Sequence, residues 1–286
     1  MSVEATPTGV IHDIGYQRYT GPRLGRGQAV LAIYQHSLRT AFGLGRTMKA
    51  KIFPWATVVI IGLVAAIATA VRTQGGDVLG YVDLPDAVSL LVILFCATAA
   101  PELVSRDLRG NVLPLYFSRP LTRTDYALAK YAALATGAFL ILAGPELLMF
   151  AGGGFSVDTW SAFGDETVDF LSGLAYSATF ALTFAAISLL VASLAGRRAV
   201  AAALIVAVFL VTTPIYGVLA SAGSERLEQL AGLVSPMTLL RGVGQWLFST
   251  EESSIGDYGP LYAATTVGLV AFCVALLLVR YRRVAR

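Results

Sequence analysis

The sequence predicts an all-α polytopic membrane protein with six transmembrane helices. Six apolar segments occur in the 286 residues, and each is close to the roughly 20 residues that a helix needs to cross a hydrocarbon core about 30 Å thick. The connections between these segments alternate in basic content, so that 18 of the 21 Lys and Arg residues would lie on one side of the membrane. This bias places both termini in the cytoplasm. The predicted spans are Ile52–Val71, Ala87–Val104, Tyr126–Phe150, Phe170–Ala195, Ala199–Ala222 and Tyr262–Val279.

The residues before the first span divide into two parts. Residues 1–27 are polar and show no periodicity, which predicts a flexible cytoplasmic tail. In residues 28–46 apolar side chains recur every four positions from Val30 to Phe42, which predicts an amphipathic helix. Such a helix typically lies in the membrane interface when it precedes a span. The alternative is a helix that packs against other parts of the protein in the cytoplasm.

The longest external connection, residues 223–260, contains an apolar stretch of its own. This stretch, Leu227–Phe248, is interrupted by Pro236 and three glycines. A seventh crossing there would break the alternation of basic connections, so we expect a re-entrant helical hairpin before the sixth span. Irregular backbone at that depth is tolerated only where protein or a water-filled cavity covers it.

Composition argues against several classes of site. The net charge is +3, but the basic residues are spread along one membrane face and form no single patch, so no nucleic-acid partner is predicted. Cys96 and Cys273 lie within spans, and His12 and His36 are isolated, so no metal site and no catalytic group is predicted. The chain has no G-x-x-x-x-G-K-[ST] loop to hold the phosphates of ATP. We therefore do not expect the chain itself to be an enzyme.

The most unusual segment is the cytoplasmic connection at residues 105–123. Apolar side chains lie between charged ones there, and they would be exposed to water without a partner. A short helix with an apolar face and a charged rim suits insertion into a groove on another protein. The alternative, of equal weight on the residues alone, is that these side chains fold back against the membrane or the protein's own helices. The candidate contact residues are Arg106, Asp107, Arg109, Gly110, Asn111, Leu113, Leu115, Tyr116, Phe117 and Arg119.

The stretch PELVSRDLRGNVLPLYFSRPLTRTDYALAKY, from Pro101 to Tyr131, resembles the loop after the second span in permease subunits of type-2 ABC exporters, and the tail is closest to actinobacterial members. An interface helix before the first span, six spans and a re-entrant hairpin before the sixth are further marks of that family, and the resemblance covers roughly residues 28–286. The chain departs from the common Gly-Thr pair of the loop, since Asn111 follows Gly110. The matching positions are Glu102, Gly110, Leu113–Phe117, Arg119–Pro120 and Lys130.

This resemblance implies that residues 28–286 form one permease domain in the plasma membrane. Within it, residues 105–123 would carry a coupling helix that docks in a cleft of a separate nucleotide-binding subunit, which would bind ATP and Mg. A second permease subunit, identical or different, would complete the channel. The first, second and fifth spans would line the transport path.

Five residues are candidates for the transport path or its gating. Glu146 would lie near the external end of the third span, and ionisable groups within spans are often functional. Solvation from the outer face explains Glu146 equally well, and a role in substrate release or in binding the re-entrant hairpin is the other possibility. Lys130 is expected to extend to the cytoplasmic interface. The candidates are Glu102, Glu146, Thr212, Thr213 and Tyr216.

Two other functions remain open from the sequence. The first is a non-transporting membrane anchor or sensor subunit that recruits a cytoplasmic ATPase through the same loop. The second and weaker one is a standalone secondary transporter. That class usually needs charged groups near the membrane midplane for ion coupling, and the spans offer essentially none.

Overall fold

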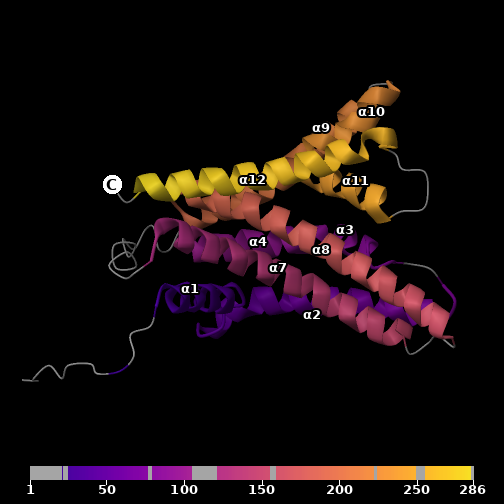
Figure 1. The fold of residues 1–286 in the computed structure, drawn as a ribbon, viewed down its shortest axis with the longest axis horizontal. Helices are drawn as coiled ribbons and strands as arrows, with labels where there is room; N and C mark the ends of the chain where they lie inside the picture. Colours follow the sequence, from indigo (N-terminus) through magenta and orange to yellow (C-terminus); the bar gives the residue numbers. More distant parts are fainter. Residues whose placement is uncertain are drawn as a thin grey trace, which may run out of the picture.

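A computed structural model describes residue 21 and residues 25–76, 79–104, 121–154, 159–221, 224–248 and 255–284. These residues form helices and short connections, with no strand among them. Figure 1 shows the helices as a bundle in which the longest members run roughly along one common direction. The α-helices are α1 (Arg26–Ala41), α2 (Met48–Arg72), α3 (Asp83–Ala87), α4 (Ser89–Leu103), α7 (Arg123–Gly154), α8 (Trp160–Leu194), α9 (Arg198–Ala220), α10 (Glu225–Ala231), α11 (Pro236–Phe248) and α12 (Gly259–Val284).

Five helices of the described chain are long and apolar enough to cross a membrane, namely α2, α7, α8, α9 and α12. The predicted all-helical class is therefore confirmed for the described residues, and five long apolar helices suggest a multi-pass membrane protein. The second predicted span corresponds to α4, which has 15 residues and is about 22 Å long at 1.5 Å per residue. That is short for a hydrocarbon core of about 30 Å. The count of six spans and the cytoplasmic location of both termini stay predictions.

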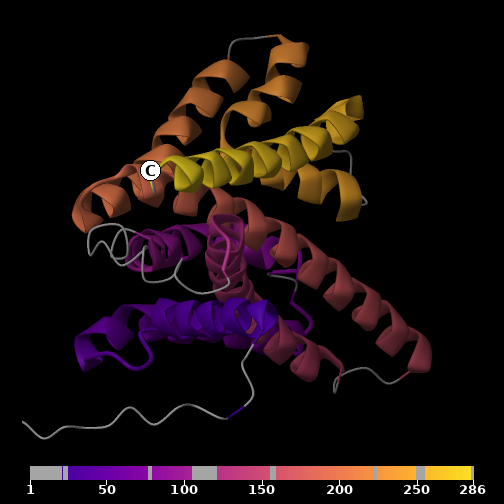
Figure 2. The same cartoon turned by 60° about the vertical axis from the view of Figure 1, so that its left-hand side comes forward.

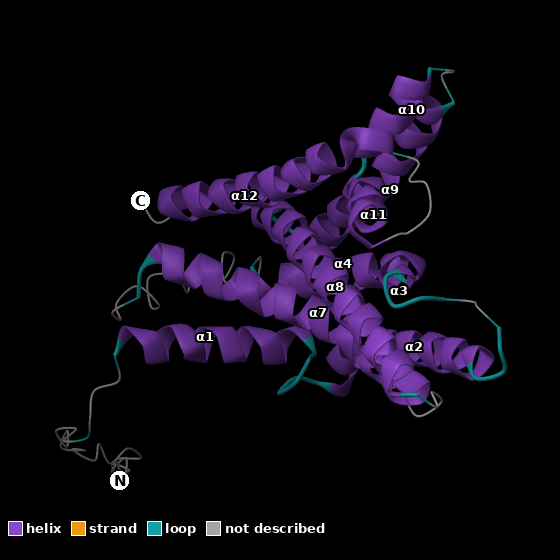
Figure 3. Ribbon diagram, turned by 45° about the vertical axis from the view of Figure 1, so that its right-hand side comes forward, coloured by secondary structure: helices purple, strands orange, loops and turns teal. Residues whose placement is uncertain are grey.

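The short helix α4 occupies the centre of the bundle. It packs against α1, α2, α7, α8 and α9, and Figure 3 shows it between α9 on one side and α7 with α2 on the other. Phe95, Ile93 and Cys96 on this helix are fully buried. A helix that is apolar on all sides is expected to be surrounded by other helices, and α4 shows this arrangement.

The helices α7 and α8 form the main antiparallel pair. They contain 32 and 35 residues, and they are the most buried of the five candidate spans. A stack of aromatic rings then joins α8 to α9, because Phe184 lies 4.1 Å from Phe180 and 4.3 Å from Phe209 between ring centroids. Figure 2 shows the result, with α1 and α2 (indigo) on one side of the bundle and α9 to α12 (orange to yellow) on the other.

The predicted amphipathic helix at residues 28–46 is confirmed as a helix, which begins at Arg26 and ends at Ala41. It packs along the first half of α7 and against α4. The hydroxyl of Tyr34 lies 3.1 Å from Oγ1 of Thr136 on α7, and the guanidinium of Arg26 makes two 2.7 Å hydrogen bonds to Asp125. These contacts show its partners within the chain, and its position in the membrane interface stays a prediction.

The predicted re-entrant segment, residues 223–260, folds into short helices in its described parts. The helix α10 is followed by the 3-10 turn η1 (Gly232–Val234), by α11, and by the 3-10 turn η2 (Gly256–Tyr258) before α12. The ring of Tyr262 lies so close to Gly232 and Gly242 that a Cβ atom at either glycine would come within 2.4 Å of it. The glycines therefore permit the contact between this segment and α12, whereas its depth in a membrane stays a prediction.

Replacing Gly173 by Ala should destabilise the bundle. A Cβ atom on Gly173 of α8 would lie 2.5 Å from Cβ of Tyr81 and 3.2 Å from its carbonyl carbon, so backbone has to shift, at a cost of about 1–3 kcal/mol. Thermal unfolding of the purified variant in detergent measures this. Gly164→Ala is the control on the same helix, because no atom lies within 4 Å of its Cβ position, and helix propensity predicts a gain of about 0.5–1 kcal/mol. Equal stability of the two variants would contradict the packing described.

Candidate functional site

The carboxylate of Glu102, on the last turn of α4, binds two arginines from distant parts of the sequence. Nη1 of Arg198 donates to Oε1 of Glu102 at 2.5 Å, and Nη1 of Arg46 lies 2.6 Å from Oε2. The side chain of Glu102 is 20% exposed, so these charges are partly shielded from water. We call these three residues the Glu102 cluster; its net charge is +1.

The local sequence explains how the cluster forms. Arg46 lies in the turn between α1 and α2, where Gly43 and Gly45 have positive φ angles of 68° and 77°. A Cβ atom at Gly43 would lie 2.5 Å from the carbonyl oxygen of Ala50, so glycine is required for this tight turn. Arg198 is the first residue of α9. The cluster thus joins the end of α4 to the segment before α2 and to the start of α9.

The predicted coupling loop begins directly after this cluster. The described part of α4 ends at Val104, and the chain is described again from Leu121. There, Thr122 and Asp125 begin α7 with reciprocal hydrogen bonds: the Thr122 N–H donates to Asp125 Oδ2 at 3.1 Å and the Asp125 N–H to Thr122 Oγ1 at 3.2 Å. The predicted contact residues Arg106, Asp107, Arg109, Gly110, Asn111, Leu113, Leu115, Tyr116, Phe117 and Arg119 lie outside the described residues.

Two ionisable residues of α7 are more buried than the sequence indicated. Glu146 is fully buried between α7 and α8, and the hydroxyl of Ser177 donates to its Oε1 at 2.5 Å. Solvation of Glu146 from the outer face is therefore wrong, whereas the expectation that the spans offer essentially no charged group near the membrane midplane stays a prediction. Lys130 is only 4% exposed, and its ammonium lies 5.2 Å from the ring centroid of Tyr126. It packs within the bundle, so extension to the interface is also wrong.

The candidates on α9 lie beside the short helices that follow it in the chain. The hydroxyl of Thr212 donates to the carbonyl of Val208 at 3.0 Å and lies 3.1 Å from Oγ of Ser235, just before α11. The hydroxyl of Thr213 donates to the carbonyl of Phe209 at 3.2 Å, and Tyr216 is half-buried one turn further along. Among the described residues, no hydrogen bond or ion pair joins these side chains to Glu102 or Glu146.

A second polar cluster lies at the end of α2 opposite to Arg46. The guanidinium of Arg72 makes two 3.2 Å hydrogen bonds to Glu166 of α8. The Tyr81 hydroxyl donates to the same carboxylate, and the Arg72 guanidinium lies 5.4 Å from the Tyr81 ring centroid. Burial, together with the adjacent Glu166 carboxylate, raises the pKa of Tyr81 above its ordinary value of 10.0. The phenol therefore stays protonated and remains a donor.

A third cluster joins α3, α8 and α11. The hydroxyl of Tyr176 donates to Oδ2 of Asp86 at 3.2 Å, and Nε of Arg241 lies 3.6 Å from the same oxygen. Burial raises the pKa of Asp86, although Arg241 and the Tyr176 hydroxyl act in the opposite direction. Arg72 and Arg241 are two of the three basic residues that fall on the predicted external side, among many acids. Their isolation there was the one signal in the sequence that pairing was to be expected.

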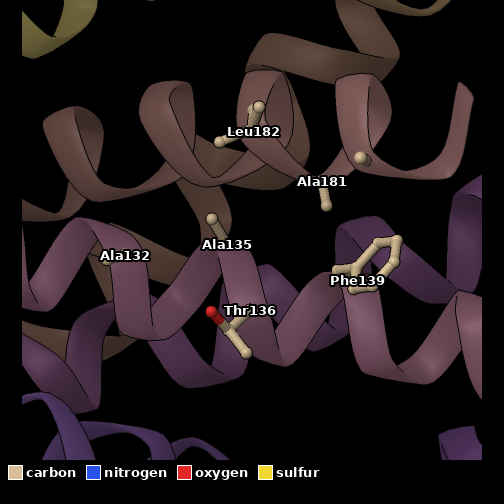
Figure 4. Close-up of a pocket in the computed structure, with 7 residues that line it drawn as sticks. Ala132, Ala135, Thr136, Phe139, Ala181 and Leu182 are labelled. Carbon is tan, nitrogen blue, oxygen red and sulfur yellow. The ribbon is translucent and has the colours of Figure 1, made fainter. Parts of the chain in front are cut away.

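An apolar pocket of about 280 Å³ opens between α7 and α8 (Figure 4). Small side chains leave this space: Ala132 and Ala135 on α7 face Ala181 on α8, with Phe139 and Leu182 at its borders. Its lining contains no ionisable group. Such a wall accommodates a hydrocarbon chain and offers nothing that would bind a charged ligand.

Comparisons with known proteins do not assign the chain to a family. No protein-family model matches it, and a search of curated proteins finds no match. In the part of the chain that the structure describes, no group of three or more His, Cys, Asp or Glu residues is placed to hold a metal ion. The Glu102 cluster and the adjacent loop therefore carry the functional argument.

Replacing Glu102 by Gln should lower the stability of the protein, because both Arg46 and Arg198 would lose their counter-ion. We expect a loss of about 1–3 kcal/mol in the free energy of unfolding, measured by denaturant titration in detergent micelles. In a double-mutant cycle, Glu102→Gln and Arg198→Gln should show a coupling of about 0.5–1.5 kcal/mol. Additive effects of the two changes would contradict a direct interaction.

The stability of the protein should respond to pH through Asp86. Since the folded-state pKa of this carboxyl is raised above its ordinary value of 3.8, the folded protein holds more protons than the unfolded one just above that value. The contribution of Asp86 to stability is thus greatest below pH 3.8 and falls as the pH rises through the folded-state pKa. Thermal unfolding at several pH values should show Asp86→Asn gaining stability relative to the parent protein across this window. A constant difference between the two proteins would refute the shift.

Proposed function

We propose that this chain is the transmembrane permease subunit of an ATP-binding-cassette exporter in the plasma membrane. In this proposal a separate nucleotide-binding subunit binds ATP and Mg and hydrolyses the ATP, and the chain couples that hydrolysis to substrate export. The helical, multi-pass architecture is compatible with this function. The resemblance of residues 101–131 to the coupling loop of type-2 exporter permeases supports it more specifically.

The Glu102 cluster is the observation that carries the proposal. Its acid, Glu102, lies three residues before the first residue of the loop that would receive the ATPase subunit. The cluster joins the end of α4 to the segment that leads into α2 and to the first residue of α9. These three helices correspond to the first, second and fifth spans, which the family resemblance assigns to the transport path. A displacement of the loop would therefore act through one carboxylate on all three.

The permease would work with partners that this chain does not supply. A second permease subunit, identical or different, would form the other half of the channel, and each would receive one ATPase subunit. The exposed apolar residues on α2, α9 and α12 fit contact with lipid or with that second subunit. ATP and Mg would be bound by the ATPase alone.

The loop provides the test. Replacing Leu115, Tyr116 and Phe117 together by Asp should abolish co-purification with the ATPase subunit and stop ATP-dependent efflux, because the proposed docking needs apolar side chains at these three positions and Asp would bring charges into the apolar cleft. Pull-down from detergent extracts and efflux from reconstituted vesicles measure the two effects. Trp160→Asp is the control, since this residue is 90% exposed at the start of α8 and should leave both measurements unchanged.

Normal efflux from the loop variant would refute the coupling role. ATPase recruitment by the parent protein without any movement of substrate in vesicles would contradict the permease assignment and would identify an anchor or sensor subunit.

A further inference from the structure

The turn between α1 and α2 borders an open hollow of about 950 Å³, which we call the pocket. It is lined by His36, Arg39 and Thr40 from α1, and by Leu44, Gly45, Arg46 and Thr47 from the turn, and most of these residues are exposed. The proposed transport function gives no role to this pocket. Its strongest hydrogen-bond donors are the two guanidiniums, since the Thr40 hydroxyl already donates to the carbonyl of His36 at 2.8 Å. Such a lining suits an anion with several acceptor oxygens.

The charge of the pocket is positive even after its salt bridge is counted. Arg46 pairs with Glu102, but that carboxylate also binds Arg198, so the three residues together keep a charge of +1. Arg39 adds a second positive charge, and its guanidinium makes no ion pair with any described residue. No acidic side chain belongs to the lining.

The location of the pocket identifies the source of the anion. The pocket ends where the candidate span α2 begins, at Met48. In the first two turns of this helix, Met48, Ile52 and Trp55 are 73%, 65% and 46% exposed. Apolar side chains so exposed on a helix of spanning length fit contact with lipid or with a second subunit, and a tryptophan is typical of the boundary between hydrocarbon and headgroups. The tryptophan favours a position of the pocket beside the headgroups, because Thr47 is about 12 Å from Trp55 along the helix.

We propose that this pocket binds a phosphate group, supplied by the headgroup of an anionic phospholipid. The guanidinium of Arg39 and the free N–H groups of Arg46 would bind its oxygens, in a geometry that arginine matches better than lysine. Basic residues next to the end of a spanning helix, on the side that is rich in Lys and Arg, are suited to such headgroups. The inference depends on the membrane location of the chain and not on its partnership with an ATPase.

The test uses the purified full-length protein in phosphatidylcholine nanodiscs that contain a small fraction of spin-labelled phosphatidylglycerol. Electron paramagnetic resonance measures the lipid immobilised on the protein. We expect preference for phosphatidylglycerol over spin-labelled phosphatidylcholine, and about tenfold weaker binding for Arg39→Gln, which loses one charge-assisted contact. Arg280→Gln is the matched control, since it removes the same charge from an exposed residue of α12 and should leave the preference unchanged.

Equal losses in Arg39→Gln and Arg280→Gln would overturn the proposal, because they would show general attraction to the charged surface and no site. Absence of any preference in the parent protein would overturn it as well. A second arm separates the two sources of phosphate. Displacement of the lipid by sodium phosphate, but not by sodium chloride of equal ionic strength, would show that the site also takes the free anion, whereas resistance to both salts would confine it to lipid.

Discussion

The pairing of charges at the two ends of the helix bundle is the constraint on which the rest of the structure depends. A charged group in a helix that crosses a membrane is costly unless it lies near an end or meets a partner. Arg26 with Asp125 and the Glu102 cluster meet this condition at one end. Arg72 with Glu166 meets it at the other. Each pair joins segments that are far apart in the sequence, so together they fix which helices are neighbours.

The lengths of the helices agree with the location of the ion pairs at the two ends of the bundle. At 1.5 Å per residue, α7 and α8 are about 48 and 52 Å long, well beyond a hydrocarbon core of about 30 Å. Their ends must therefore extend into headgroups or water, and the ion pairs of Asp125 and Glu166 lie at those ends. In contrast α4 is short and packs against six other helices, α1, α2, α3, α7, α8 and α9. Before Glu102 it has only two polar residues, Ser89 and Thr98, and the Thr98 hydroxyl donates to carbonyls of its own helix.

The sequence was sufficient to predict the class of the fold and most of its helices. Hydrophobic length predicted six spans, of which five correspond to helices long and apolar enough to cross a membrane, and the four-residue repeat identified α1. The sequence could not predict which side chains surround Lys130 and Glu146. Helical periodicity shows which residues share a face of a helix but not which other helix covers that face. Both residues were expected to reach an interface, and both are buried by neighbours that approach along the whole length of α7. The same limit applies to Glu102. The sequence identified this residue as a candidate but could not predict that Arg46 and Arg198 are its partners.

The sharing of one acid by two guanidiniums has a consequence for movement. If Arg46 or Arg198 separates from Glu102, the other still neutralises the carboxylate, so neither rearrangement leaves a bare anion at the end of α4. An isolated pair in the same surroundings would expose both charges when it opened, at much greater cost. The end of α4 can thus exchange one neighbouring helix for another in single steps, and the Glu102 carboxylate keeps one arginine partner throughout.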